Sequence, residues 1–141
     1  MDDKYKPYEY KGVCQKCGKE FVKVYNAVKN ANQLAIDKIY SGITGFNADN
    51  IAREYLKSVG YDKEFSHSLG HGIGLRIHES PRLSPKYSGT LEDNMVFSIE
   101  PGIYLDNKFG VRIEDTVVLE NGKVKRLFDD KKDLIIVKKI S

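Results

Sequence analysis

Residues 65–79 read FSHSLGHGIGLRIHE, and this stretch decides how the rest of the chain is interpreted. It holds every histidine of the sequence, namely His67, His71 and His78, separated by glycines. Neutral imidazole is the commonest metal ligand in proteins and carries protons near neutral pH. Glycine lets the backbone bend and lets a ligand approach closely. The stretch predicts a metal or catalytic site, and the alternative is a glycine-rich strand pair with three surface histidines.

Length and composition are typical of a single globular domain. The chain has 141 residues, of which 40% are hydrophobic and 30% charged. The net charge is only +3, and the basic residues near the C-terminus alternate with aspartates, which favours a mixed-sign surface over a nucleic-acid patch. No signal-peptide pattern is present, and the longest strongly apolar run, residues 134–137, is too short to span a bilayer. We therefore expect a cytoplasmic protein with neither nucleic acid nor membrane among its partners.

The two cysteines, Cys14 and Cys17, form a single C-x-x-C motif. A structural zinc site needs four ligands, and the chain has no second cysteine pair and no histidine at suitable spacing. A redox motif stays open, because Gly18 directly precedes a helical pattern. Two reduced thiols near a chain end are the favoured interpretation.

Two amphipathic helices are expected before the histidine stretch. Apolar residues recur at helical spacing over residues 19–40, and Gly42 is the expected C-cap of this helix. A second helix is expected to begin after Asn47, a good N-cap residue, and to end at Gly60. Residues 1–17 are polar and show no clear period at their start, so we expect an extended or disordered leader.

Antiparallel strands are expected to follow. Proline restricts the residue before it, so Ser80-Pro81 and Ser84-Pro85 are expected to lie in a loop. Residues 111–119 alternate between two faces as a half-buried strand does. Asn121-Gly122 is a type I′ turn signal, which predicts a hairpin. Strands are expected over residues 95–99, 103–105, 111–119, 124–128 and 134–137. Two helices followed by such strands predict an α+β fold.

Two glutamates complete a set of candidate metal ligands with His71. Glu100 follows an apolar strand, where a carboxylate is unfavourable unless it is paired or metal-bound. Glu114 lies inside an otherwise apolar strand, and Arg112, two residues earlier on the same face, could pair with it. For each glutamate alone, a surface position or an ion pair is the commoner explanation. Together with His71 they give a mixed nitrogen and oxygen set, which suits Mn, Co, Zn or Fe better than a thiolate-selecting metal.

Three segments resemble one family. They are SHSLGHGIGLRIHESPRLS, MVFSIEPGIYL and GVRIEDTVVL, and they resemble the C-terminal half of the catalytic domain of the Xaa-Pro aminopeptidase and prolidase family. The spacings also agree with the family, with 29 residues from His71 to Glu100 and 14 from Glu100 to Glu114. The resemblance implies that residues 18–141 form part of a pita-bread fold, in which two helices pack on a curved antiparallel sheet.

The resemblance also implies roles for individual residues. The family's metal ligands match His71, Glu100 and Glu114, of which the last matches a carboxylate that bridges two metals. The residues of the substrate site match His67, which would contact the substrate near the scissile bond, and His78, which would stabilise the tetrahedral intermediate or carry a proton.

By the same resemblance, Arg112 would hold a metal-binding or substrate carboxylate.

The activity that the resemblance implies is metal-dependent hydrolysis of the peptide bond before proline, on a peptide with proline in the second position. Manganese or cobalt is the first choice of metal, followed by zinc or iron.

The sequence departs from the family at two further aspartate ligands. Their S-D-x-T-R-T signature is absent, their positions would fall in or before residues 1–12, and Pro7 stands about where the second belongs. We therefore expect the dinuclear centre to be at most partly occupied and hydrolysis by this chain alone to be impaired. We also expect a homodimer, or association with a missing N-terminal half, to cover an open sheet edge. The alternatives are a non-catalytic module that binds peptide or protein, and creatinase-like hydrolysis of another C–N bond.

Overall fold

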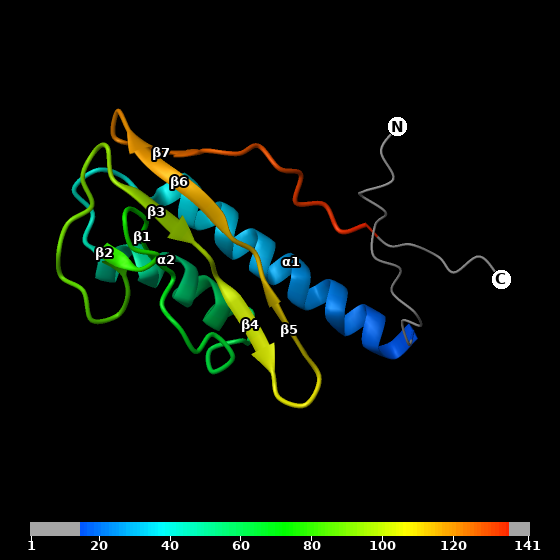
Figure 1. The fold of residues 1–141 in the computed structure, drawn as a ribbon. Helices are drawn as coiled ribbons and strands as arrows, with labels where there is room; N and C mark the ends of the chain where they lie inside the picture. The colour runs from blue at the N-terminus through cyan, green and yellow to red at the C-terminus, as the bar shows by residue number, and fades with distance from the viewer. Residues whose placement is uncertain (1–14, 136–141) are drawn as a thin grey trace, which may run out of the picture.

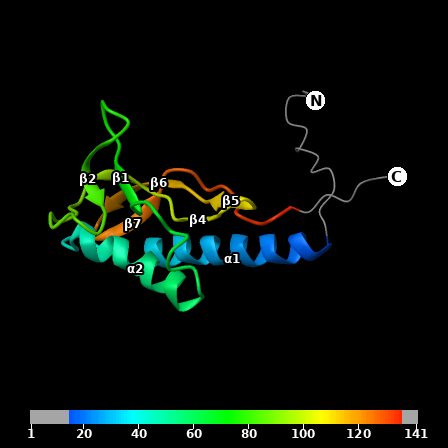
Figure 2. The ribbon, with the colours of Figure 1, turned by 90° about the horizontal axis from the view of Figure 1, so that it is seen from below.

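The computed structural model describes residues 15–135, with side chains from residue 18 onward. Two helices come first, α1 (Gln15–Lys38) and α2 (Gly45–Ser58), and seven strands follow them. The strands are β1 (Gly70–Gly72), β2 (Glu79–Leu83), β3 (Val96–Ile99), β4 (Gly102–Leu105), β5 (Phe109–Arg112), β6 (Asp115–Glu120) and β7 (Lys123–Arg126). Figures 1 and 2 show two layers, with both helices on one face of the strands. The expected α+β class is confirmed.

The strands form two antiparallel ladders that follow each other along α1. Five strands make the larger sheet in the order β2-β1-β3-β6-β7, and β4 pairs with β5 in a separate ribbon. β3 runs into β4 and β5 runs into β6, so the ribbon extends the two central strands of the sheet (Figure 1). A bond from the Ile113 N–H to the Pro101 carbonyl, 3.3 Å long, bridges the two ladders. The junctions between β3 and β4 and between β5 and β6 therefore lie side by side, where the sheet meets the ribbon.

The core lies between α1, α2 and the sheet. The predicted apolar face of α1 is buried at Val28, Ala31 and Ala35, as expected, and Ile39 is buried just beyond the end of the helix. Asn32 is also buried on this face, where its Nδ2 donates to the Ile99 carbonyl at 3.1 Å. Each fully buried aliphatic side chain stabilises the fold by about 1.5–3 kcal/mol. The sheet contributes Phe97, Ile99, Val117 and Leu119 to the same cluster.

The start of α2 differs from the prediction. The N-cap is Thr44, whose Oγ1 accepts from the Asn47 N–H at 3.2 Å, so the assignment of Asn47 as N-cap is wrong. Thr44 has extended backbone angles and an oxygen positioned for this bond, which is what an N-cap requires. Gly60 ends α2 with a φ of +90°, as expected. Gly42 lies four residues beyond α1 in the following turn and does not cap that helix.

Two strand predictions are also wrong. Ser80 and Pro81, expected in a loop, lie in β2, where the register with β1 is irregular. β2 is an edge strand paired only with β1, so a proline there is tolerated. The single strand expected over residues 111–119 is divided into β5 and β6, with Ile113 and Glu114 between them. The alternation of buried and exposed residues continues through this break.

The C-terminal predictions are confirmed in part. Asn121 and Gly122 have φ of 52° and 78°, as a type I′ hairpin turn requires, and β7 returns beside β6. β7 ends at Arg126, two residues before the expected end. Residues 134 and 135 belong to no strand, and 136–137 lie outside the described residues.

The N-terminal predictions are largely untested. Cys14 and the side chain of Cys17 lie outside the described part of the chain, so the C-x-x-C interpretation stays a prediction. The leader expected over residues 1–17 falls mostly there too, and α1 begins at Gln15. Within residues 15–135, neither helix has the length and hydropathy that a membrane span requires.

Candidate metal and substrate site

A cleft of about 420 Å³ lies where the central strands meet the loop over residues 73–78. This loop joins β1 to β2 and rises from the face of the sheet opposite the helices (Figure 2). The predicted site residues that line the cleft are His71, His78, Glu100, Arg112 and Glu114. Residues from the loop complete the lining, namely Ile73, Gly74, Leu75, Arg76 and Ile77. Folding therefore brings candidate ligands from distant parts of the sequence to one cavity.

His71 and Glu100 are in direct contact in this cleft. His71 Nε2 lies 3.2 Å from Glu100 Oε1, and His71 Nδ1 lies 3.0 Å from the carbonyl oxygen of Gly72. A carbonyl oxygen only accepts, so Nδ1 carries a hydrogen. In the neutral ring the lone pair is then on Nε2, facing a carboxylate oxygen. A proton or a metal cation between the two atoms satisfies both, and the bond from Nδ1 is the usual support for a metal-binding histidine.

The Glu100 carboxylate is held by neighbouring polar groups. Glu100 is only 9% exposed, and its Oε1 accepts a hydrogen bond from Ser98 Oγ at 2.9 Å. The same hydroxyl accepts from the His71 N–H at 3.1 Å. Arg112 Nη1 lies 3.7 Å from Glu100 Oε2. These contacts compensate the hydration that the carboxylate loses on burial and fix its orientation beside His71.

The glycines of the histidine stretch are needed for strand packing. A Cβ at Gly70 would overlap the carbonyl oxygen of Ser98, and one at Gly72 would overlap that of Ser80. The sequence suggested that these glycines admit a ligand. At these two positions it is the neighbouring strands that approach closely, and this brings His71, between them, up against β3.

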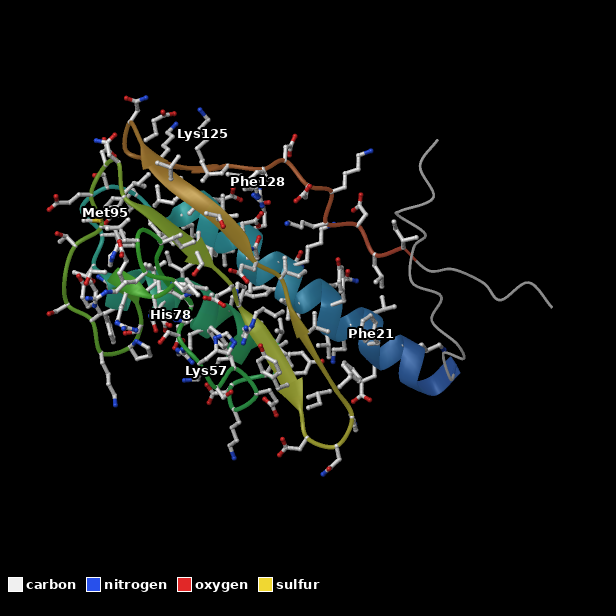
Figure 3. The ribbon with its side chains drawn as sticks, in the orientation of Figure 1. Phe21, Lys57, His78, Met95, Lys125 and Phe128 are labelled. Atoms are coloured by element: carbon white, nitrogen blue, oxygen red, sulfur yellow. The ribbon has the colours of Figure 1, made fainter. Side chains whose placement is uncertain are left out.

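His78 and Glu114 occupy the more open part of the cleft. Both are exposed, and the centroid of the His78 ring lies 4.3 Å from that of His71. Figure 3 labels His78 beside the β1–β2 end of the sheet, to the left of β4 in this view. Among the side chains of residues 18–135, no three of His, Cys, Asp or Glu lie close enough together to hold a metal ion. The predicted ligands thus share one cavity, but only His71 and Glu100 are in contact.

His67 lies beside the cleft and does not line it. Its Nδ1 donates to the Ser68 carbonyl at 2.8 Å, and its Nε2 is buried without a hydrogen-bond partner. Its ring lies 5.6 Å from the Tyr104 ring, whose hydroxyl accepts from Arg112 Nε at 2.7 Å. A buried ring nitrogen with a free lone pair is a group that a bound ligand could satisfy.

Two polar residues of the site were missed in the sequence. Ser98 supports both His71 and Glu100, and Tyr104 joins His67 to Arg112. Ser98 could have been found, because it lies two residues before Glu100 and so on the same face of the strand. No local signal marks Tyr104.

Comparisons with known proteins identify relatives of this chain and of its fold. The sequence pattern of metallopeptidase family M24 matches residues 12–121. The Xaa-Pro dipeptidase of Pyrococcus furiosus is 45% identical over 112 residues, which are 79% of this chain and 32% of that protein. A dipeptidase structure from Pyrococcus horikoshii superposes with a TM-score of 0.82 at 41% identity, covering 84% of this chain and 33% of the other. The X-prolyl aminopeptidase of Caenorhabditis elegans, described as a cytosolic enzyme with a di-nuclear active site, superposes with a TM-score of 0.70 at 28% identity, over 84% and 21% of the two chains.

These likenesses define part of a metallopeptidase domain with the pita-bread fold of the prolidases, as the sequence predicted. The chain belongs to metallopeptidase family M24. It spans about a third of the length of the curated Xaa-Pro dipeptidases from the two Pyrococcus species that it matches.

Proposed function

We propose that this chain supplies the metal-binding and substrate-binding part of a peptidase that hydrolyses the bond before proline. The observation that carries the proposal is the contact of His71 Nε2 with Glu100 Oε1 in a cleft that Glu114, His78 and Arg112 also line. Relatives named Xaa-Pro dipeptidase, at 40–45% identity, support the substrate class.

His71 and Glu100 fit two ligand positions of a divalent transition metal, and Glu114 lines the same cleft. Ligands bound to one such ion at about 2.0–2.2 Å lie roughly 3 Å apart, close to the separation of His71 Nε2 and Glu100 Oε1. We propose His71, Glu100 and Glu114 as ligands, with Mn or Co ahead of Zn or Fe. When bound, the metal polarises the substrate carbonyl and lowers the pKa of a bound water.

The other residues of the site act on the peptide. His78 is exposed beside His71, so its ring can carry a proton to the departing nitrogen or donate to the tetrahedral intermediate. Arg112 holds a carboxylate, as it already does toward Glu100. His67 is proposed to contact the substrate near the scissile bond, which requires its Nε2, buried without a hydrogen-bond partner beside the cleft, to become accessible. Leu75 and Ile77 are 106% and 79% exposed, and they offer an apolar surface at the cleft for a proline ring.

We further propose that this chain alone turns over substrate weakly. The proposal is supported by the lack of a close three-ligand group among the side chains described, those of residues 18–135. Association with a second copy or with a chain that supplies further carboxylates would complete the site. A cytoplasmic location is part of the proposal, as for the cytosolic relative from Caenorhabditis elegans.

Metal titration and a hydrolysis assay test the proposal together. The protein is dialysed against Mn²⁺ or Co²⁺, its bound metal is measured by elemental analysis, and Gly-Pro and a longer Xaa-Pro peptide are offered as substrates. We expect at most one bound metal per chain, loss of that metal in His71→Ala, and slow hydrolysis that a chelator abolishes. Glu92→Gln removes an exposed carboxylate outside the cleft and serves as the control. Metal binding that His71→Ala leaves unchanged would contradict the proposal.

A non-catalytic binding module is the second candidate, favoured by the same lack of a close three-ligand group. It predicts that a peptide with proline in the second position binds equally well with and without a chelator. The peptidase proposal predicts weaker binding after metal removal, because a metal held by His71 and Glu100 would attract the free amino end of the peptide. Isothermal titration with and without EDTA separates the two.

A further inference from the structure

Helix α2 carries an ion pair directed at the histidine stretch. Asp49 is 1% exposed and Arg53 follows it one turn later. Arg53 Nε donates to Asp49 Oδ2 at 2.7 Å, and Arg53 Nη2 donates to Oδ1 at 3.0 Å. This bidentate geometry fixes the plane of the guanidinium group and leaves its outer N–H groups facing away from the carboxylate.

Those outer groups, with the carboxylate, bind the backbone of residues 65–69. Arg53 Nη1 donates to the Phe65 carbonyl at 3.0 Å, and Nη2 donates to the His67 carbonyl at 2.9 Å. Asp49 Oδ1 accepts from the Leu69 N–H at 2.9 Å. One ion pair thus satisfies a backbone group on each of three alternate residues, so the segment is fixed on both sides of His67.

The side chains of this segment are fixed by the same group. The Arg53 guanidinium lies over the Phe65 ring, 4.4 Å from its centroid, and the Phe65 ring contacts the His67 ring edge-on at 5.1 Å and 85°. The His67 ring then has one further bond, from Nδ1 to the Ser68 carbonyl, which leaves the lone pair on Nε2. The tautomer of His67 therefore depends on where the backbone of residues 65–69 is held.

The ion pair is also linked to Glu100. The Leu69 carbonyl accepts from the Glu100 N–H at 2.8 Å, and the Leu69 N–H is the group bound by Asp49. Leu69 is fully buried, so water cannot replace the hydrogen bonds of its N–H and carbonyl groups if these are lost.

We infer that Asp49 and Arg53 are positioning residues for the site, setting the orientation of the His67 imidazole and the place of Glu100 through residues 65–69. The inference rests on the proposed function in so far as that function assigns His67 to the substrate. Lysine at position 53 would keep the charge but cannot form two parallel bonds and bind two carbonyls as well.

Imidazole ¹⁵N NMR of the full chain tests the inference without an activity measurement. In the unaltered protein we expect His67 to show a single Nδ1–H tautomer. In Arg53→Lys, and in Asp49→Asn as a second variant, we expect the His67 signals to shift toward a mixture of the two tautomers. Val24→Ala, a buried cavity variant on α1, is the control for general destabilisation and should leave the His67 tautomer unchanged. A folded Arg53→Lys or Asp49→Asn protein with the His67 tautomer of the unaltered chain overturns the inference.

The unaltered protein gives a decisive result even if both variants fail to fold. Arg53 donates four hydrogen bonds through Nε, Nη1 and Nη2, so it should rotate slowly about its Cζ–N bonds and its Nη hydrogens should give separate signals. A single averaged signal overturns the inference. Hydrolysis is then measured on the folded variants, where we expect kcat to fall more than KM changes. If the His67 tautomer changes in the variants but the unaltered protein has no peptidase activity, the proposed function is refuted and the positioning role stands. If the unaltered protein is active but the tautomer does not change in the variants, the positioning role is refuted and the proposed function stands.

Discussion

The two sides of the cleft are built differently. On one side, residues 65–72 are held by buried strands and by the Asp49–Arg53 pair. On the other side, residues 74–78 form an exposed loop, whose base is closed by the bond from the Arg76 N–H to Glu79 Oε2 at 3.1 Å. The first side presents the groups proposed to bind metal, which need fixed geometry. The second presents His78 and apolar side chains, which can adapt to a substrate.

A leucine on each side gives the sharpest test of this difference. Leu69 is fully buried and Leu75 is fully exposed, so Leu69→Ala should lower the free energy of unfolding by about 2–5 kcal/mol. Leu75→Ala should change it by about 0.5 kcal/mol or less. Urea denaturation followed by circular dichroism measures both. Equal losses for the two variants would mean that the loop is packed as tightly as the strand side.

A substitution at Ser98 tests whether the proposed metal affinity of His71 and Glu100 depends on the hydrogen bonds that hold these two residues in place. Ser98→Ala removes the hydroxyl that bonds both Glu100 Oε1 and the His71 N–H. We expect the Kd for Mn²⁺ to rise by about 10–100-fold, the usual loss when a ligand's supporting partner is removed. Calorimetric titration measures it, with the exposed Ser88→Ala as the control. An unchanged Kd in a folded Ser98→Ala protein would show that Glu100 is oriented by other contacts.

Two substitutions at the start of α2, the helix that carries the Asp49–Arg53 pair, test which residue is its N-cap. Thr44→Ala removes the oxygen that accepts from the Asn47 N–H and should destabilise the protein by about 1 kcal/mol. Asn47→Ala, on the residue that sequence reasoning chose as the cap, should have the smaller effect. Thermal unfolding compares the two, and the reverse order would restore Asn47 as the cap.

The smallest effect is expected far from the cleft. The Lys29 ammonium donates to the Asp133 carboxylate at 2.8 Å and lowers the pKa of Asp133 below its ordinary value of 3.8. A lowered pKa in the folded state gives stability that is present above pH 3.8 and is lost as the pH falls through the folded value. Both side chains are well exposed, so solvent screens the pair. Asp133→Asn should slightly flatten acid unfolding at low salt and have no effect at 1 M salt.

The sequence predicted those parts of the molecule that depend on local patterns. The spacing of Val28, Ala35 and Ile39 predicts α1, and the alternation through residues 111–119 survives even where the strand is broken. Asn121-Gly122 predicts its hairpin because the positive φ angles of that turn suit those two residues. For the site, the resemblance carried by the histidines and glutamates selected six residues, of which five, Arg112 among them, line one cleft.

Only the tertiary structure decided how those residues are arranged. Pro81 lies in a strand because β2 is at an edge, and His67 lies beside the cleft because Arg53 and Asp49 hold its segment there. The 3.2 Å contact of His71 with Glu100 depends on Gly70 and Gly72 letting three strands approach closely. A local pattern reports the preferences of residues a few positions apart. These contacts join residues that are distant in sequence, and their geometry exists only after packing has excluded every other arrangement.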